Sequence, residues 1–286
     1  MLFWIEMFAM VFAAAAEQAP TAARGKIPFQ VGEKLSYVIK WSVIPVGEAE
    51  LRVSDGEAKI GSPSYLFQAS VKSYPMVDLI YKVRDHVESY TDRSMIHSLL
   101  YKKKQREGRH KRNVTVEFDW DESKAHYYSQ GKHNKTVTLL PGTFDPLGVF
   151  YAFRLNPLTD NLEVEAPVTD GKKCVIGRAR VIRREEVAVD AGAFDTFLVE
   201  PDLRHIGGIF KKSKGAKLRL WVTADDRRIV VKAKSKVAVG HFTAELVSME
   251  RVAQQKSLEP QKGMPTVQGY AGGFKSRANC MPGRQD

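Results

Sequence analysis

Alternation of apolar and polar residues with a period of two runs through most of this 286-residue chain and limits what it can fold into. The segment EKLSYVIKWSV shows the pattern clearly. Leu35, Tyr37 and Ile39 share one face, and Ser36 and Lys40 share the other. Successive side chains of a β-strand point to opposite faces, so this pattern is typical of a strand that buries one face.

Segments of the same kind recur at short spacing, with Gly, Pro and Asp residues marking turns between them. The predicted strands are 33–43, 48–53, 65–73, 80–90, 98–106, 112–120, 125–129, 136–140, 163–168, 175–189, 194–200, 216–223, 228–233 and 237–249. So many short strands predict a mainly β protein built on a large antiparallel, strongly curved sheet. Either a half-open sheet or a closed barrel or roll would leave few exposed edges.

One short helix interrupts the strands, in the stretch TFDPLGVFYAFRL. Asp145 can cap the free N–H groups, and Pro146 suits the first helical position. Leu147, Phe150 and Tyr151 follow at spacings of three and four, which makes an apolar stripe. A helix this short needs to dock on the sheet to be stable.

Residues 1–16 predict an export signal. Their run LFWIEMFAMVFAAAA falls short of the about 20 residues of a transmembrane helix and ends in an A-x-A site at Ala14 and Ala16. No Lys or Arg precedes the run and Glu6 lies within it, which a start codon further upstream would explain. We therefore expect a mature protein that begins near Glu17, has no transmembrane span, and resides in the periplasm or outer envelope. The alternative is a buried N-terminal helix.

The rest of the chain divides into three predicted parts. Residues 17–31 form a polar linker, 32–252 a single β-rich domain, and 253–286 a tail that is polar, rich in Gly and Pro, and without period. Cys174 and Cys280 fit no zinc pattern, and two cysteines fix neither a pairing nor a compartment. We expect no metal and no cofactor.

Six segments of the chain, in order and spacing, resemble one family of exported bacterial proteins. They are GEKLSYVIKWSVIPVGEAEL, VRDHVESYTD, YKKKQREGR, TFDPLGVFYAFRL, GAFDTFLVEP and LRLWVTADDRRIVVKAKSKVAVGHFTAEL, and the family is DUF3108. The resemblance covers about 32–250. It implies a curved β-domain delivered to the periplasm or outer envelope, and it brings no catalytic residues.

The formal net charge of +11 favours anionic partners. The densest basic stretch is YKKKQREGRHKR, which the flanking strands and Gly108 place at the tip of a hairpin. It is either a solvated tip whose charges protect strand edges or a rim that binds phosphate or acidic glycan, since both faces of both strands turn basic. The candidate rim residues are Lys102, Lys103, Lys104, Arg106, Arg109, Lys111 and Arg112.

Nucleic acid is not an expected partner of this hairpin. Beyond Tyr101 the basic stretch has no interleaved aromatic residues on which bases could stack, and the chain has no RNA-recognition signature. Export would also separate the protein from nucleic acid.

Large aromatic residues offer a second candidate site. If the sheet closes they fill its core, and if it stays half open they line a groove for an acyl chain or an apolar partner. The candidate groove residues are Tyr37, Trp41, Phe67, Tyr81, Trp120, Phe150 and Trp221.

Catalytic and metal-binding patterns are sparse. No GxSxG, HExxH, GxGxxG or Walker motif occurs. His86 and Glu88 share a strand face beside Asp85, which is a weak acid/base candidate. His126 and His133 bracket a predicted hairpin and could approach each other, but no third ligand is evident.

These observations favour a non-enzymatic envelope protein that binds an anionic amphiphile, a glycan or an envelope protein partner. Anionic lipid, lipopolysaccharide and acidic glycan are the candidate ligands. The alternative is an envelope enzyme acting through Asp85, His86 and Glu88. A cytoplasmic nucleic-acid binder is a third hypothesis, which requires that residues 1–16 are not a signal.

Overall fold

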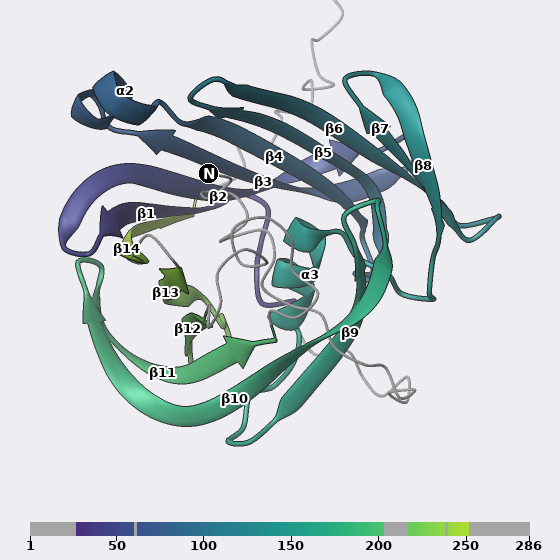
Figure 1. Cartoon of the computed structure of the whole chain (residues 1–286). Coiled ribbons are helices and arrows are strands. Elements are labelled where there is room, and N and C mark those ends of the chain that lie inside the picture. Colours follow the sequence, from purple (N-terminus) through teal and green to yellow (C-terminus); the bar gives the residue numbers. More distant parts are fainter. Residues whose placement is uncertain (1–26, 60–61, 203–216, 238–239, 252–286) are drawn as a thin grey trace, which may run out of the picture. The chain divides into compact units, whose positions relative to one another are not determined.

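The computed structural model describes residues 27–59, 62–202, 217–237 and 240–251 (Figure 1). The predicted signal at 1–16, most of the predicted linker and the predicted tail at 253–286 lie outside the described residues. Cys280 lies outside them as well.

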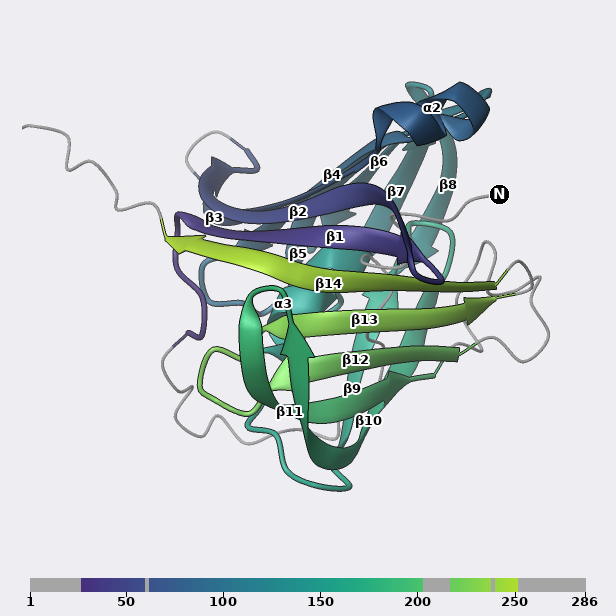
Figure 2. The same ribbon diagram turned by 90° about the vertical axis from the view of Figure 1, so that its left-hand side faces the viewer.

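Fourteen strands of the described residues form one antiparallel sheet, which confirms the predicted fold class (Figures 1 and 2). Their order is β8-β7-β6-β5-β4-β3-β2-β1-β14-β13-β12-β11-β10-β9. Strands β1 to β8 lie side by side in chain order, and β8 forms one edge of the sheet. Strands β9 to β14 also lie side by side in chain order, and β9 forms the other edge. Hydrogen bonds between β1 and β14 join the two series. Because β8 and β9 do not pair with each other, the sheet is not closed.

The first series of strands comprises β1 (Glu33–Trp41), β2 (Ile44–Glu57), β3 (Pro63–Ser73), β4 (Arg84–Asp92), β5 (Ser98–Glu107), β6 (His110–Asp119), β7 (Lys124–Ser129) and β8 (Lys132–Thr138). The second comprises β9 (Glu163–Thr169), β10 (Cys174–Val189), β11 (Gly192–Pro201), β12 (Lys217–Thr223), β13 (Val230–Val237) and β14 (Gly240–Arg251). The predicted strand 237–249 was therefore wrong at its start, because Val237 ends β13 and Gly240 begins β14.

Helix α3 (Pro146–Phe153) lies inside the curve of the sheet, as Figure 1 shows. Asp145 caps it as predicted: its Oδ1 accepts hydrogen bonds from the backbone N–H groups of Leu147 and Gly148, both at 2.9 Å. The ring of Tyr151 stacks on Phe67 of β3 with centroids 3.9 Å apart. Because nearly every side chain of this helix is apolar, it is stable only when the sheet buries it.

The segment between β8 and α3 ties distant strands together. The carbonyl of Thr143 accepts a hydrogen bond from the backbone N–H of Ser98 in β5. Phe144 then pairs with β9 by two hydrogen bonds, to Pro167 and from Thr169. The segment thus connects the two series of strands on the side where the sheet stays open.

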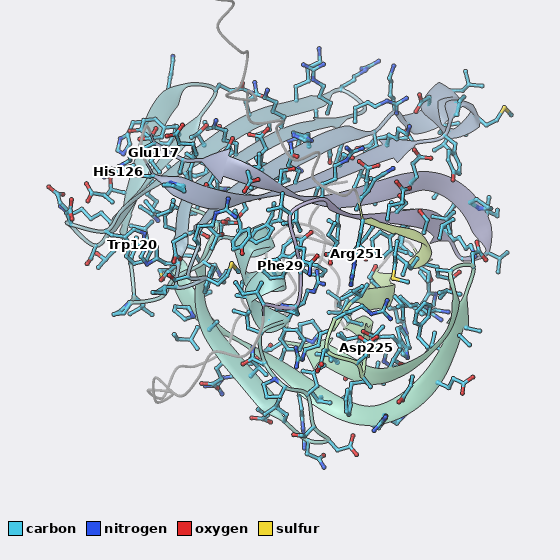
Figure 3. All side chains as sticks on the ribbon, turned by 180° about the vertical axis from the view of Figure 1, so that it is seen from behind. Phe29, Glu117, Trp120, His126, Asp225 and Arg251 are labelled. Atoms are coloured by element: carbon cyan, nitrogen blue, oxygen red, sulfur yellow. The ribbon has the colours of Figure 1, made fainter. Side chains whose placement is uncertain are left out.

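A buried ion pair lies at the end of α3. Arg154 donates to both carboxylate oxygens of Glu33, at 2.6 and 3.0 Å, and to the backbone carbonyls of Pro28 and Arg227. The guanidinium carbon of Arg154 lies over the ring of Phe29, 5.4 Å from the ring centroid, and Figure 3 shows Phe29 inside the sheet. These partners satisfy the charges, which is the condition for burying them.

A second helix, α2 (Pro75–Tyr81), was not predicted. The predicted strand 80–90 was wrong at its start, because β4 begins only at Arg84. Pro75 occupies the start of the helix, and Asp78 anchors it through hydrogen bonds from the side chains of Ser73 and Arg84. These local bonds outweigh the strand pattern that continues into Ile80.

Candidate functional site

The β5–β6 hairpin ends in the predicted tight turn. Gly108 adopts φ +56°, a conformation that glycine tolerates without the clash of a Cβ atom. Its backbone N–H donates to the carbonyl of Lys82 at 2.8 Å, and Glu107 forms an isolated bridge with Val83. The basic tip therefore lies directly beside the end of α2.

Strand alternation divides the predicted basic rim between two faces of the sheet. Lys102, Lys104 and Arg106 point to the outer face, and Lys111 shares it because it lies opposite Arg106. Arg109 lies in the turn.

The other two predicted rim residues point inward. Lys103 is only 9% exposed, so its prediction as a solvent-exposed rim residue was wrong. Its side chain follows buried Tyr101 on the inner face of β5, because residues two apart share a face. Arg112 also points inward and donates to the hydroxyl of Tyr127 at 2.5 Å.

Four cations at the tip have no anionic partner among the described residues. They are Lys104, Arg106, Arg109 and Lys111, all of them exposed. No described carboxylate lies within 4.0 Å of their nitrogen atoms. Lys102 instead lies over the ring of Tyr90, at 5.4 Å from its centroid. The tip therefore presents uncompensated positive charge to the solvent.

An open groove of about 410 Å³ runs along the outer face from this tip across β5 to β2. Lys104 and Arg106 form its basic wall, and Glu48 and Lys72 pair at 2.7 Å on the opposite side. His86 lies between them on β4, directly opposite Lys104. The groove is open, and most of its lining residues are charged or polar, which suits a charged head group better than an acyl chain.

The structure brings together two of the three predicted acid/base residues. His86 Nε2 lies 3.3 Å from Glu88 Oε1, and the hydroxyl of Tyr90 donates to Glu88 Oε2 at 3.4 Å. Asp85 points to the opposite face and is buried. The sheet thus separates Asp85 from the other two residues.

A row of buried polar side chains lies on the inner face behind the tip. Asp85, Gln105 and Glu107 are each nearly inaccessible, and the amide of Gln105 has no hydrogen-bond partner among the described residues. Burial raises the pKa of Asp85. Hydrogen bonds from the Arg106 N–H and from Glu107, and the charge of Lys103, lower this pKa, but by less than burial raises it. Sequence reasoning missed this row, although Gln105 and Glu107 continue the period set by Tyr101.

Helix α2 presents its apolar stripe to solvent. Met76, Leu79 and Ile80 are 77%, 82% and 89% exposed, whereas Val77 and Tyr81 pack against the core. The spacing of three and four after Pro75 was the available sequence signal for this stripe.

The turn between β1 and β2 also exposes apolar residues, at the same end of the sheet as α2. Val43 and Ile44 are 84% and 58% exposed. The backbone N–H of Tyr74, just before α2, donates to the carbonyl of Val46, and Ser73 lies opposite Gly47. These contacts join the residues just before α2 to β2, three and four residues beyond Val43.

The predicted aromatic groove is not a continuous surface. Tyr37, Phe67 and Phe150 are buried in the core. Tyr81 and Trp120 are partly buried against it, and Trp120 donates to the carbonyl of Ser98. In Figure 3, Trp120 lies towards the side of the sheet, away from Phe29.

The other two groove candidates lie elsewhere. Trp221 points to the outer face of β12, where its Nε1 donates to Glu185 at 2.7 Å. Trp41 lies at the end of β1 and stacks on Phe242. Most of these aromatic residues therefore fill the core rather than line a groove.

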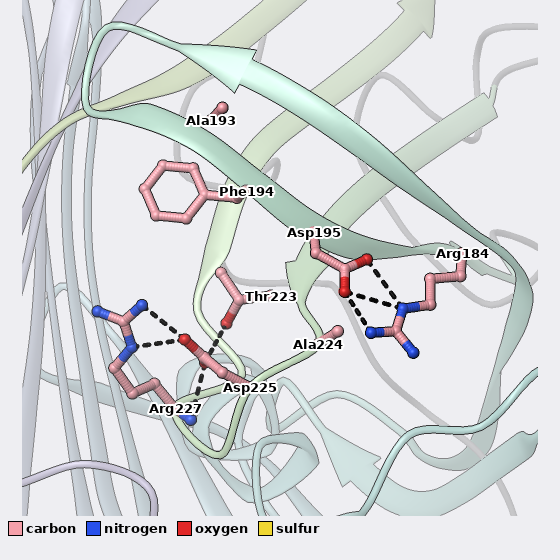
Figure 4. A pocket seen from close by; sticks show the side chains of 8 residues that line it. All are labelled: Arg184, Ala193, Phe194, Asp195, Thr223, Ala224, Asp225 and Arg227. Carbon is pink, nitrogen blue, oxygen red and sulfur yellow. Dashed lines mark hydrogen bonds and ion pairs between the residues drawn. The ribbon is translucent and has the colours of Figure 1, made fainter.

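A second pocket, of about 430 Å³, lies between β11 and the β12–β13 connection (Figure 4). Two arginines line it, and each is already paired within it. Arg184 bonds Asp195, and Arg227 bonds Asp225 at 2.6 and 2.8 Å. The pocket therefore offers little unpaired charge to a ligand.

His126 and His133 approach each other, as predicted, with ring centroids 6.0 Å apart. Both lie within hydrogen-bond distance of the Thr136 hydroxyl, at 3.2 and 3.0 Å. In the described ranges, no three or more His, Cys, Asp or Glu side chains gather closely enough to hold a metal ion.

The described part of the chain also contains no helix with the length and hydrophobicity of a membrane span. The family model described as "Protein of unknown function (DUF3108)" matches residues 36–247. No curated protein sequence matches the chain significantly.

Solved structures give remote matches. The Brucella abortus β-barrel-like protein of the domain of unknown function DUF1849 is 11% identical, with a TM-score of 0.51, covering 78% of this chain and 98% of its own. This likeness concerns the fold alone. A Bacteroides fragilis protein described as exported, with a YmcC-like fold, is 11% identical, with a TM-score of 0.30, covering 78% of this chain and 98% of its own. A Parabacteroides distasonis protein described as a lipoprotein is 12% identical, with a TM-score of 0.28, covering 77% of this chain and 96% of its own.

Proposed function

The chain belongs to the DUF3108 family, and we propose that it is a non-enzymatic protein of the cell envelope that binds an anionic amphiphile at the tip of the β5–β6 hairpin. The observation that carries this proposal is the group of four exposed cations without anionic partners among the described residues, Lys104, Arg106, Arg109 and Lys111. The envelope location rests on the predicted export signal at 1–16.

Uncompensated cations at one end of a sheet create a local positive potential that attracts clustered phosphate or carboxylate groups. Each Lys or Arg close to an anionic lipid surface contributes about 1 kcal/mol, and salt screens the attraction over about 8 Å at physiological ionic strength. The groove beside Lys104 and Arg106 gives a head group room to approach these side chains. Binding should therefore be mainly electrostatic.

A charge-matched pair of variants tests the proposal. The tip variant carries Lys104→Ser, Arg109→Ser and Lys111→Ser, and the control variant removes three exposed lysines of β12 and β13, by Lys217→Ser, Lys234→Ser and Lys236→Ser. Both lose the same formal charge. Vesicles of phosphatidylglycerol and phosphatidylcholine serve as one probe and inorganic polyphosphate as the other.

We expect the tip variant to lose about 3 kcal/mol, roughly 100-fold, of vesicle affinity at low salt, and the control variant to lose only a small part of that. Thermal unfolding should change little in either variant, because exposed charges contribute about 0.5 kcal/mol or less each. Equal losses in both variants would show that net charge alone drives binding and would refute the tip as the site. Undiminished binding in the tip variant would refute the proposal as well.

A further inference from the structure

We infer that the anionic surface recognised by the tip is that of a lipid bilayer, and that α2 and the β1–β2 turn insert apolar side chains into it. This inference rests on the proposed function, because it names the ligand of the same cationic tip. A free amphiphile, a soluble polyanion and a protein partner are the competing occupants.

The first argument is that α2 exposes apolar residues on the face where an ordinary surface helix carries charge. Helices usually bury their apolar stripe and expose charge. Here Asp78 points toward the protein, where the side chains of Ser73 and Arg84 hold it, and Leu79 and Ile80 point outward. Because Asp78 is bonded on that side, the helix cannot turn its apolar stripe inward without breaking an ion pair.

The second argument is that two separate connections expose apolar residues at the same end of the sheet. The backbone N–H of Tyr74, just before α2, donates to the carbonyl of Val46, three residues beyond Val43 of the β1–β2 turn. Figure 2 shows the turn and the helix at the same end of the strands. Val43 and Ile44 are therefore exposed at the same end of the sheet as the apolar stripe of α2. Exposed apolar residues concentrated at one end of a molecule indicate an interaction site.

The third argument is the charge beside that surface. Lys82 directly follows α2 and is exposed, and its carbonyl accepts a hydrogen bond from the Gly108 N–H at the turn of the basic hairpin. A Cβ atom on Gly108 would lie 2.8 Å from the ring of Tyr81, so the turn and the helix are in direct contact. Apolar side chains flanked by cations form the composition of helices that lie in the interface of anionic membranes.

This combination favours a bilayer over the other occupants. A soluble polyanion would use the cations and leave the apolar stripe in water. A single acyl chain needs a concave apolar site, whereas the side chains of α2 project from the surface. A bilayer offers phosphates at the level of Arg109 and Lys111 and hydrocarbon just below them.

The experiment compares Leu79→Ser/Ile80→Ser with a matched control, Ile96→Ser/Val247→Ser, which removes two other exposed apolar residues. Vesicle flotation with phosphatidylglycerol and phosphatidylcholine is measured at low and high salt, and polyphosphate binding is measured in parallel. The full chain is used, alongside the chain lacking residues 1–16, so that binding by that apolar segment is recognised. A Leu79→Trp variant reports insertion through its fluorescence.

We expect the α2 variant to lose about tenfold or more in vesicle binding at high salt, where the electrostatic part is screened. Its polyphosphate affinity should stay within about twofold of wild type, and the control variant should bind normally. The fluorescence of the tryptophan introduced by Leu79→Trp should shift to the blue with phosphatidylglycerol vesicles and stay unchanged with polyphosphate.

Normal vesicle binding by the α2 variant, with no fluorescence shift, would overturn the inference and leave the proposed anion site standing. Polyphosphate binding without any vesicle binding would do the same. Conversely, loss of vesicle binding in the α2 variant together with normal binding in the tip variant would support insertion and refute the proposed role of the cations.

Discussion

Cations on β10, β12 and β13 and cations at the β5–β6 tip are of the same types but differ in their surroundings. Apart from the exposed Lys217, Lys234 and Lys236, every cation on these three strands has a carboxylate within 4.0 Å. These pairs are Arg178–Glu165, Arg180–Glu163, Arg183–Glu185, Arg184–Asp195, Arg219–Glu200 and Lys232–Glu245. At the tip, the four exposed cations have none among the described residues.

The difference shows that net charge is a poor guide to where an anion binds. An arginine that already shares its charge with a neighbouring carboxylate offers little to a ligand, and the exposed pair itself stabilises the fold by only about 0–1 kcal/mol. The pocket of Figure 4 illustrates this, because Arg184 and Arg227 are both occupied there. A cation without a carboxylate partner is therefore necessary for an anion site but not sufficient, since the exposed lysines of the control variant also lack one in the part of the chain that the structure describes.

The largest expected effect concerns the buried ion pair of Arg154 and Glu33, because this pairing stabilises the fold. Arg154→Met should lower the free energy of unfolding by about 3–5 kcal/mol, because it leaves Glu33 charged and buried without its partner. Urea unfolding measures the change. A double change, Arg154→Met with Glu33→Leu, should restore much of the loss. A loss below about 1 kcal/mol in Arg154→Met would mean that the pair is not a structural element.

Freeing the paired cations should create a second anion site. Glu165→Gln, Asp195→Asn and Glu200→Gln remove the partners of Arg178, Arg184 and Arg219. We expect polyphosphate affinity to rise by about tenfold, the effect of roughly 1–2 kcal/mol of new attraction, with at most about 1 kcal/mol of stability lost per pair. No gain in affinity would show that the position of the tip matters more than its lack of partners.

The smallest effect concerns Asp85, on the inner face behind the tip. Its pKa is raised in the folded protein, so the native state binds this proton more tightly than the unfolded chain does. The protein should therefore lose stability as pH rises from the ordinary aspartate range through the raised pKa. Asp85→Asn removes this titration, and its stability relative to wild type should increase with pH over that window. Unfolding curves at several pH values check the slope, and parallel curves for the two proteins would contradict it.

The sequence predicted the parts of this molecule that depend on local chemistry. Alternation located most strands, Asp145 and Pro146 located α3, and Gly108 located the hairpin turn. It failed at α2, because Ile80 continues the alternation of β4 while the helix depends on the contact of Asp78 with Arg84.

The site was less predictable than the fold. The alternation of side chains along β5 already places Lys103 on the opposite face from Lys102 and Lys104. Both faces of this strand carry a mixture of polar and apolar residues, so the sequence does not say which face is buried. Only the packing of Tyr101 in the structure shows that the face of Lys103 is the buried one. The exposed stripe of α2 could not be told from a core segment, because a sequence pattern does not say whether anything covers it. Arg154 and Glu33 are far apart along the chain, and no local pattern links them.

The pairing of β1 with β14 joins residues that are more than 200 positions apart, such as Glu33 and Arg251. In contrast, each strand from β2 to β8 pairs with the strand that precedes it in the chain. Such local pairings form quickly, whereas distant ones carry the entropy cost of closing a long loop. During folding, the edge of β1 therefore stays open until β14 reaches it. That edge is where a chaperone would have to act, and where an incompletely folded chain would aggregate.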